Sequence, residues 1–134
     1  MSKKWLVTGF LFAAIAIILG AFGAHGLKSF LESGKIDAQG LMSFDTAARY
    51  QMYHAFALIV CGILAKLSGE NRFIQIAGIL FVAGIIFFSG SLYLLSTRTI
   101  TGISWSWLGP ITPLGGLCFI GGWLVLAIGV IRKK

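Results

Sequence analysis

The sequence predicts an all-α integral membrane protein in which four spanning helices form one bundle. Two observations lead to this prediction, the composition and the spacing of the apolar stretches. Hydrophobic residues make up 57% of the 134 residues and charged residues 11%, which is more apolar surface than a soluble core of this size can bury. Apolar stretches occur at about 5–24, 45–66, 73–95 and 109–131, and each can cross about 30 Å of hydrocarbon as a helix. We therefore expect a single multi-pass domain over residues 1–134, in the cell membrane.

The first span, 5–24, contains no charged residue and follows Lys3 and Lys4. A secretory signal peptide begins in the same way, but its apolar region is usually about 7 to 15 residues long. We therefore expect a retained helix. Its small residues recur at steps of three and four and fall on one face, at Gly9, Ala13, Ala16, Gly20 and Gly23. Such a face allows two helices to approach closely in lipid.

Residues 25–45 form the longest polar connection in the chain. Helical spacing of Leu27, Phe30 and Leu31 predicts a short helix here, lying at the membrane surface and ending at Gly34. Asp45 and Arg49 are four residues apart, so we expect their side chains to pair at the mouth of the second span.

The periodicity of the second span predicts one face toward the other helices and one face toward lipid. The interior face consists of Tyr50, His54, Ala57, Cys61 and Ala65, and the lipid face of Met52, Phe56, Ile59 and Ile63. The third span has a stripe of polar and small residues at the same periodicity, made of Gln75, Gly78, Val82, Ser89, Tyr93 and Ser96. We expect this stripe to pack against the interior face of the second span.

The fourth span begins with Pro110 and Pro113, which are tolerated where the first helical turn lacks partners for its N–H groups. Three glycines then recur every seven residues, at Gly115, Gly122 and Gly129. This spacing predicts a second face for close helix packing. The small-residue faces of the first and fourth spans are the surfaces through which we expect any homo-oligomer to form.

The distribution of basic residues predicts that both termini are cytoplasmic. Seven lie on the side of the termini and of the loop between the second and third spans, namely Lys3, Lys4, Lys66, Arg72, Arg132, Lys133 and Lys134. Four lie on the other side, namely Lys28, Lys35, Arg49 and Arg98. An excess of Lys and Arg marks the cytoplasmic side of a membrane protein.

The same distribution argues against nucleic-acid binding, because the basic residues form no stripe despite a net charge of +7. Cys61 and Cys118 both fall in apolar runs, which is typical of inert buried thiols and indicates neither a disulfide framework nor a metal site. The chain lacks a phosphate-binding glycine loop, a His-Glu-x-x-His motif and a nucleophile elbow. We therefore expect no enzyme activity and no metal.

Four blocks of sequence resemble the signature of a known family. They are residues 20–27 (GAFGAHGL), Thr46-Ala47 together with 50–55 (YQMYHA), 88–93 (FSGSLY) and 109–116 (GPITPLGG). The chain resembles the domain of unknown function 423 family, which includes bacterial members and the animal transmembrane protein 256. This resemblance spans nearly the entire chain and implies four transmembrane helices. It implies no established activity, so it assigns no role to any residue.

Polar side chains converge on one half of the predicted bundle, the half opposite the termini. The residues that we expect to form this candidate cluster are His25, Arg49, Tyr50, Gln51, His54, Ser89, Tyr93 and Arg98. Three hypotheses follow from it. The cluster holds the bundle together in a structural or assembly role, it binds or transports a membrane lipid, a quinone or a small solute, or it holds haem between His25 and His54.

His54 is the predicted centre of the cluster, because an ionisable ring inside a span needs polar partners. Desolvation favours the neutral imidazole, whose donor and acceptor then both need partners. The antiparallel course of the second and third spans predicts a hydrogen bond from His54 to Ser89 or Tyr93.

Overall fold

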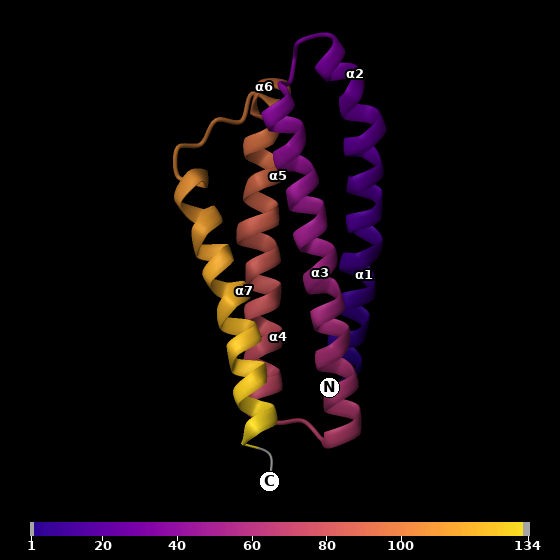
Figure 1. The fold of residues 1–134 in the computed structure, drawn as a ribbon, viewed down its shortest axis with the longest axis vertical. Helices are drawn as coiled ribbons and strands as arrows, with labels where there is room; N and C mark the ends of the chain where they lie inside the picture. Colours follow the sequence, from indigo (N-terminus) through magenta and orange to yellow (C-terminus); the bar gives the residue numbers. More distant parts are fainter. Residues whose placement is uncertain (1, 133–134) are drawn as a thin grey trace.

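The structure is a computed structural model that describes residues 2–132, and it contains four long helices that run antiparallel to one another (Figure 1). Their bounds are Ser2–Glu32, Ala38–Ser68, Arg72–Ser96 and Leu108–Ile131, and each is long and apolar enough to cross a membrane. No strand occurs among the described residues. The predicted all-α fold with four spanning helices is therefore confirmed.

The first long helix consists of α1 (Ser2–Ala21), a π-helical segment η1 (Phe22–Gly26) and α2 (Leu27–Glu32). The predicted short helix is present as α2, and the left-handed backbone of Gly34, with φ of +74°, follows its end. It continues the first span without a break (Figure 1), so it is not the separate helix that we expected. No proline interrupts the chain here, and Gly23 and Gly26 are accommodated in the wider π-helical turn.

The second helix, α3 (Ala38–Ser68), begins well before the predicted boundary near residue 45. Asp37 caps it, because its Oδ1 accepts a 2.7 Å hydrogen bond from the backbone N–H of Gly40. Asn71 caps the following helix in the same way, accepting from the N–H groups of Phe73 and Ile74. The start of the second helix and the start of the third are thus each defined by a local polar contact.

The third helix is built of α4 (Arg72–Gly84), a second π-helical segment η2 (Ile85–Gly90) and α5 (Ser91–Ser96). A short helix α6 (Arg98–Thr101) and a loop then lead to α7 (Leu108–Ile131). The two π-helical segments overlap two of the four sequence blocks, residues 20–27 and 88–93. Segments of this kind occur often at functional sites.

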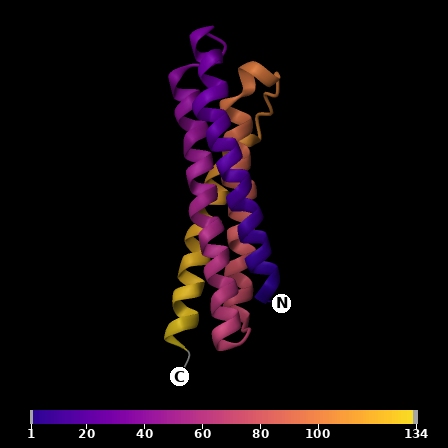
Figure 2. The same ribbon diagram turned by 90° about the vertical axis from the view of Figure 1, so that its right-hand side faces the viewer.

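The helices are arranged with α3 and α4 in the middle, α1 against α3, and α7 against α4 (Figures 1 and 2). In the most apolar 18-residue stretch of each helix, 44% and 39% of the residues are buried in the second and third helices. The corresponding values are only 17% and 22% in the first and fourth. The two outer helices therefore leave most of their apolar side chains for lipid or for other proteins to cover.

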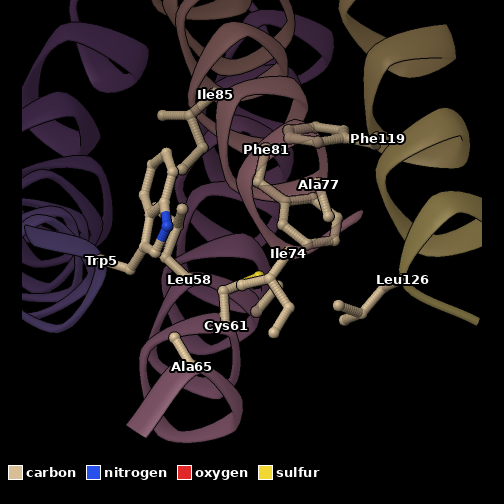
Figure 3. Packing of buried hydrophobic residues seen from close by; sticks show 11 residues of the cluster. Trp5, Leu58, Cys61, Ala65, Ile74, Ala77, Phe81, Ile85, Phe119 and Leu126 are labelled. Atoms are coloured by element: carbon tan, nitrogen blue, oxygen red, sulfur yellow. The ribbon is translucent and has the colours of Figure 1, made fainter. Parts of the chain in front are cut away.

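The main hydrophobic core lies toward the end of the bundle that carries the turn between α3 and α4 (Figure 3). Figure 3 shows Trp5 of α1, Leu58 and Cys61 of α3, and Phe81 and Phe119 of the other two helices within one cluster. A smaller cluster of Leu27, Ile36 and Phe44 closes the opposite end. Both clusters are apolar, and the buried side chains of Gln51 and His54 lie in the region between Phe44 and Leu58 of α3.

The predicted faces of the second span are confirmed for most of their residues. Buried residues include His54, Ala57, Cys61 and Ala65, whereas Phe56 and Ile63 are exposed. Tyr50 and Ile59 are the exceptions. Tyr50 is 40% exposed although the periodicity assigns it to the interior face, and Ile59, which the periodicity assigns to the lipid face, is half-buried and packs against Gly9 of α1.

The start of α1 and the end of α7 lie at the same end of the bundle as the turn between α3 and α4 (Figure 1). The charge excess that predicts this end to be cytoplasmic includes Lys133 and Lys134, which lie outside the described residues. The orientation in the membrane stays a prediction.

Candidate functional site

Gln51 of α3 connects three helices through its side-chain amide. Its Nε2 donates to the backbone carbonyl of Phe12 in α1 at 2.9 Å. Its Oε1 accepts from the hydroxyl of Tyr93 in α5 at 2.8 Å. Gln51 is only 3% exposed, so these contacts supply the partners that a buried amide requires. Neither Phe12 nor the Gln51–Tyr93 pairing was predicted from the sequence.

His54 connects α3 to the fourth helix. Its Nδ1 lies 2.7 Å from the carbonyl oxygen of Tyr50, and its Nε2 lies 3.2 Å from the indole Nε1 of Trp123. A carbonyl oxygen only accepts and an indole N–H only donates. The proton therefore belongs on Nδ1, and Nε2 accepts from Trp123. This arrangement fits a neutral ring with both nitrogens bonded.

Aromatic rings enclose the His54 imidazole. Phe119 stacks on it, with ring centroids 3.5 Å apart and planes 10° apart, and Phe81 lies on another side at 5.7 Å. Because 95% of the residue is covered, with 5% exposed, water and ligands have little access to the ring. The polar atoms of His54 thus face the protein interior.

The predicted hydrogen bond from His54 to Ser89 or Tyr93 is wrong. Tyr93 bonds to Gln51, and Nε2 of His54 accepts from Trp123 of α7 and makes no bond to the third helix. The prediction weighed only the third helix as a neighbour. A tryptophan in the middle of an apolar span is the signal that could have identified the partner, because an indole N–H in the apolar part of a membrane needs an acceptor.

Ser89 lies within η2 and is completely buried, and its Oγ has no partner among the described residues. The adjacent polar link is made by Ser91, whose Oγ lies 2.5 Å from Oγ1 of Thr112 in α7 and 3.0 Å from the carbonyl oxygen of Phe88. The hydroxyl that connects the third and fourth helices is therefore Ser91, which is not in the predicted cluster.

Three other members of the predicted cluster do not join Gln51 and His54. Arg49 pairs with Asp45, with 2.7 Å between Nε and Oδ2, which confirms that predicted ion pair. His25 and Arg98 are exposed. Tyr50 contributes its backbone carbonyl, while its ring packs against Phe88 at a centroid distance of 4.8 Å. The structure thus brings together Tyr50, Gln51, His54 and Tyr93 and leaves the charged residues at the surface.

The glycines of the fourth helix pack against phenylalanines of the third. A Cβ on Gly122 would lie 2.6 Å from Cε1 of Phe81, and one on Gly129 would lie 2.7 Å from Cβ of Phe73. A Cβ on Gly115 would clash with the backbone of Phe87 and Phe88. The predicted close-packing face is therefore occupied within one chain.

The small-residue face of the first helix is used within the chain as well. A Cβ on Gly9 would lie 2.7 Å from Cγ1 of Ile59 in α3, and Ala16 is buried. A homo-oligomer stays a prediction, but these small residues are not free to form its interface.

A metal site would need several His, Cys, Asp or Glu side chains close together in the described part of the chain. No group of three or more His, Cys, Asp or Glu residues there could hold a metal ion. Within the cluster, His54 has no nucleophile or carboxylate as a partner, because its ring nitrogens face a carbonyl oxygen and an indole. This arrangement is suited to holding helices together and lacks the parts of an acid–base site.

Comparison with known proteins gives one family and close relatives. The family described as protein of unknown function (DUF423) matches residues 19–116. The UPF0382 membrane protein YwdK of Bacillus subtilis is 44% identical over 131 residues, covering 97% of this chain and 98% of the relative. A UPF0382 membrane protein of Haemophilus influenzae is 37% identical over 134 residues, covering 100% and 98%. No solved structure matches the chain.

Proposed function

Because the chain belongs to the DUF423 family, whose relatives are named only as membrane proteins, we propose a structural or assembly role in the membrane without enzyme activity. The observation that carries this proposal is the use of Gln51 and His54. These two residues of α3 hydrogen-bond to all three other long helices, through Phe12, Tyr93 and Trp123. We call these two residues ties, because their side chains link α3 to the other helices by hydrogen bonds.

Such ties matter more in a membrane than in water, because lipid gives helices no hydrophobic reason to associate. Close packing and interhelical hydrogen bonds supply the specificity instead. Each bond contributes about 0.6 kcal/mol on average, and up to about 1.7 kcal/mol. The two ties set the position of α3 relative to every neighbour, which favours one rigid bundle whose outer helices can meet partners.

The outer helices support the assembly part of the proposal. Large apolar side chains are exposed along α1 and α7, among them Phe10, Ile17, Leu117 and Leu124. In a membrane, lipid or other membrane proteins cover such surfaces.

The test compares stability with ligand content in the full-length protein purified in detergent. His54→Ala removes the acceptor for Trp123 and is expected to lower stability by about 1 to 3 kcal/mol. His54→Gln should restore part of this loss, since its carbonyl oxygen can accept from the indole. Ile63→Ala, on the exposed face of α3, is the control and should change stability much less. Mass spectrometry should find the same small molecules in all four proteins. Unchanged stability of His54→Ala together with loss of a co-purifying molecule would contradict the structural role.

The cluster itself gives little support to the alternative of a bound quinone, solute or lipid. The amide oxygen and nitrogen of Gln51 and both ring nitrogens of His54 have partners inside the chain. The same bonds argue against haem, because an axial histidine needs a free ring nitrogen. A Soret band in the purified protein would overturn this part of the proposal.

We also propose that the protein lies in the cell membrane with both termini in the cytoplasm. The charge excess on the side of the termini supports this orientation. Reporter fusions inserted at Ser33 and Gly69 should report opposite sides, with Gly69 cytoplasmic. The same side for both insertions would contradict the four-span topology.

A further inference from the structure

A groove of about 510 Å³ opens between the first helix and α3, away from Gln51 and His54. One wall is made of Gly20, Gly23 and Ala24, and the other includes Asp45, Thr46 and Arg49. Its volume lies in the range of ligand-binding clefts, about 300 to 1,000 Å³. The groove therefore combines a smooth wall of small residues with a wall that has charged and hydroxyl groups.

The groove is open because small residues face each other across it. A Cβ on Gly20 would meet only Cβ of Ala48, at 3.9 Å. Elsewhere along the same helix pair the glycines are filled from the opposite side, as at Gly9 by Ile59. The space beside Gly20 is thus a gap in the packing between the two helices.

The ion pair at the edge of the groove has unused hydrogen-bonding atoms. Nε of Arg49 and Oδ2 of Asp45 bond to each other, and the two side chains are 65% and 57% exposed. In the described structure the two Nη atoms of Arg49, Oδ1 of Asp45 and the Thr46 hydroxyl have no partner. One positive and one negative group are therefore presented side by side, with donors on one and an acceptor on the other.

We propose that this groove binds one zwitterionic phospholipid with a phosphoethanolamine headgroup. The phosphate lies on the Nη atoms of Arg49, whose fork of donors suits phosphate oxygens, and the Thr46 hydroxyl donates to it. The ammonium group lies on Oδ1 of Asp45. A zwitterion matches a paired cation and anion, whereas a purely anionic headgroup would gain from Arg49 and be repelled by Asp45.

The surface next to the groove suits the acyl chains. Ile17 of α1 and Phe56 of α3 are 63% and 58% exposed. Ile17 is three residues from Gly20 and Phe56 is seven residues from Arg49, so helical spacing places both on the faces that line the groove, toward the middle of the bundle. A lipid with its headgroup on Arg49 and Asp45 can lay its chains along this apolar surface. The site shares no residue with the ties at Gln51 and His54, so it goes beyond the structural role and does not depend on it.

The test is native mass spectrometry of the full-length protein in detergent, titrated with dioctanoyl-phosphatidylethanolamine. Two lipids with the same acyl chains serve as comparisons. Dioctanoyl-phosphatidylglycerol has an anionic headgroup, and dioctanoylglycerol has no phosphate. We expect the phosphatidylethanolamine to bind about tenfold more tightly than either, which equals about 1.4 kcal/mol. Equal binding of the diacylglycerol, or tighter binding of the phosphatidylglycerol, would overturn the proposal.

Two kinds of variant locate the site. Gly20→Leu fills the groove and should weaken binding of the phosphatidylethanolamine at least tenfold, whereas Ala21→Leu adds the same side chain at the next, exposed position and should not. Arg49→Gln and Asp45→Asn each remove one charge and should each weaken binding about tenfold. A thermal melt of each variant identifies any loss of fold, and the two charge variants keep the test decisive if Gly20→Leu fails to fold. Wild-type affinity in folded Gly20→Leu, or in both charge variants, would overturn the site.

Discussion

The two outer helices pack against the central pair in different ways, although both use a face of small residues. Along α4 and α7, phenylalanines fill the glycine positions, with Phe81 on Gly122, Phe73 on Gly129 and Phe119 on Gly84. Along α1 and α3 the contact is tight at Gly9, yet at Gly20 the opposite residue is Ala48 and a groove remains. A stripe of glycines thus predicts close approach, but the residue across from it decides whether the result is packing or a binding groove.

The largest loss of stability is expected from adding a methyl group to a glycine that already contacts a phenylalanine ring. Gly122→Ala places a Cβ 2.6 Å from Cε1 of Phe81, so the ring or the helix must move. We expect a loss of about 2 kcal/mol in the free energy of unfolding, measured by denaturation in detergent micelles. Gly20→Ala is the matched control and should be neutral, because its Cβ meets nothing closer than 3.9 Å. Equal losses of stability in Gly122→Ala and Gly20→Ala would contradict the difference between the α4–α7 and α1–α3 contacts.

A smaller loss of stability is expected when the hydrogen bonds of Gln51, which link α3 to α1 and α5, are removed. Gln51→Leu keeps the side-chain volume roughly constant but loses the bonds to Phe12 and Tyr93. The partly buried Tyr93 hydroxyl then lacks its partner, and we expect stability to fall by about 1 to 2 kcal/mol. Met52→Leu at the neighbouring position is the control. Denaturation curves that coincide for Gln51→Leu and the wild type would show that shape alone aligns these helices.

The smallest effect is expected at the buried hydroxyl that has no partner. Ser89→Ala removes an unsatisfied Oγ, so stability should stay within about 0.5 kcal/mol of the wild type or rise. Ser91→Ala, two residues away, loses the contact with Thr112 and should cost about 1 kcal/mol. If Ser89→Ala is the more harmful of the two in the same denaturation assay, then Ser89 has a partner that the bundle alone does not provide.

The sequence predicted the number of helices and the buried face of α3, because both follow from composition and from the 3.6-residue period. Periodicity works at His54, Ala57, Cys61 and Ala65, which face the interior as expected. It cannot show which helix lies opposite, and for that reason the partner of His54 was sought on the third helix although it is Trp123 of the fourth.

The predicted helix boundaries were wrong where local structure departs from the apolar pattern. Residues 38–44 contain polar side chains and resemble a loop, but the cap at Asp37 starts α3 there. The π-helical segments η1 and η2 depart from the regular helical period, so no pattern of apolar residues predicts them. The groove was also beyond prediction, because it depends on the pairing of Gly20 with Ala48 across two helices.

The central claim is that His54 is a tie whose two ring nitrogens are both used inside the bundle. Nitrogen-15 chemical shifts of the His54 ring, in full-length protein in micelles at neutral pH, test this claim directly. We predict a neutral ring with the proton on Nδ1, an Nε2 that couples to the Trp123 indole N–H, and no change when quinone or lipid is added. A proton on Nε2, or a shift of the ring signals on adding either molecule, would contradict the structural role and return the cluster to the candidate ligand sites.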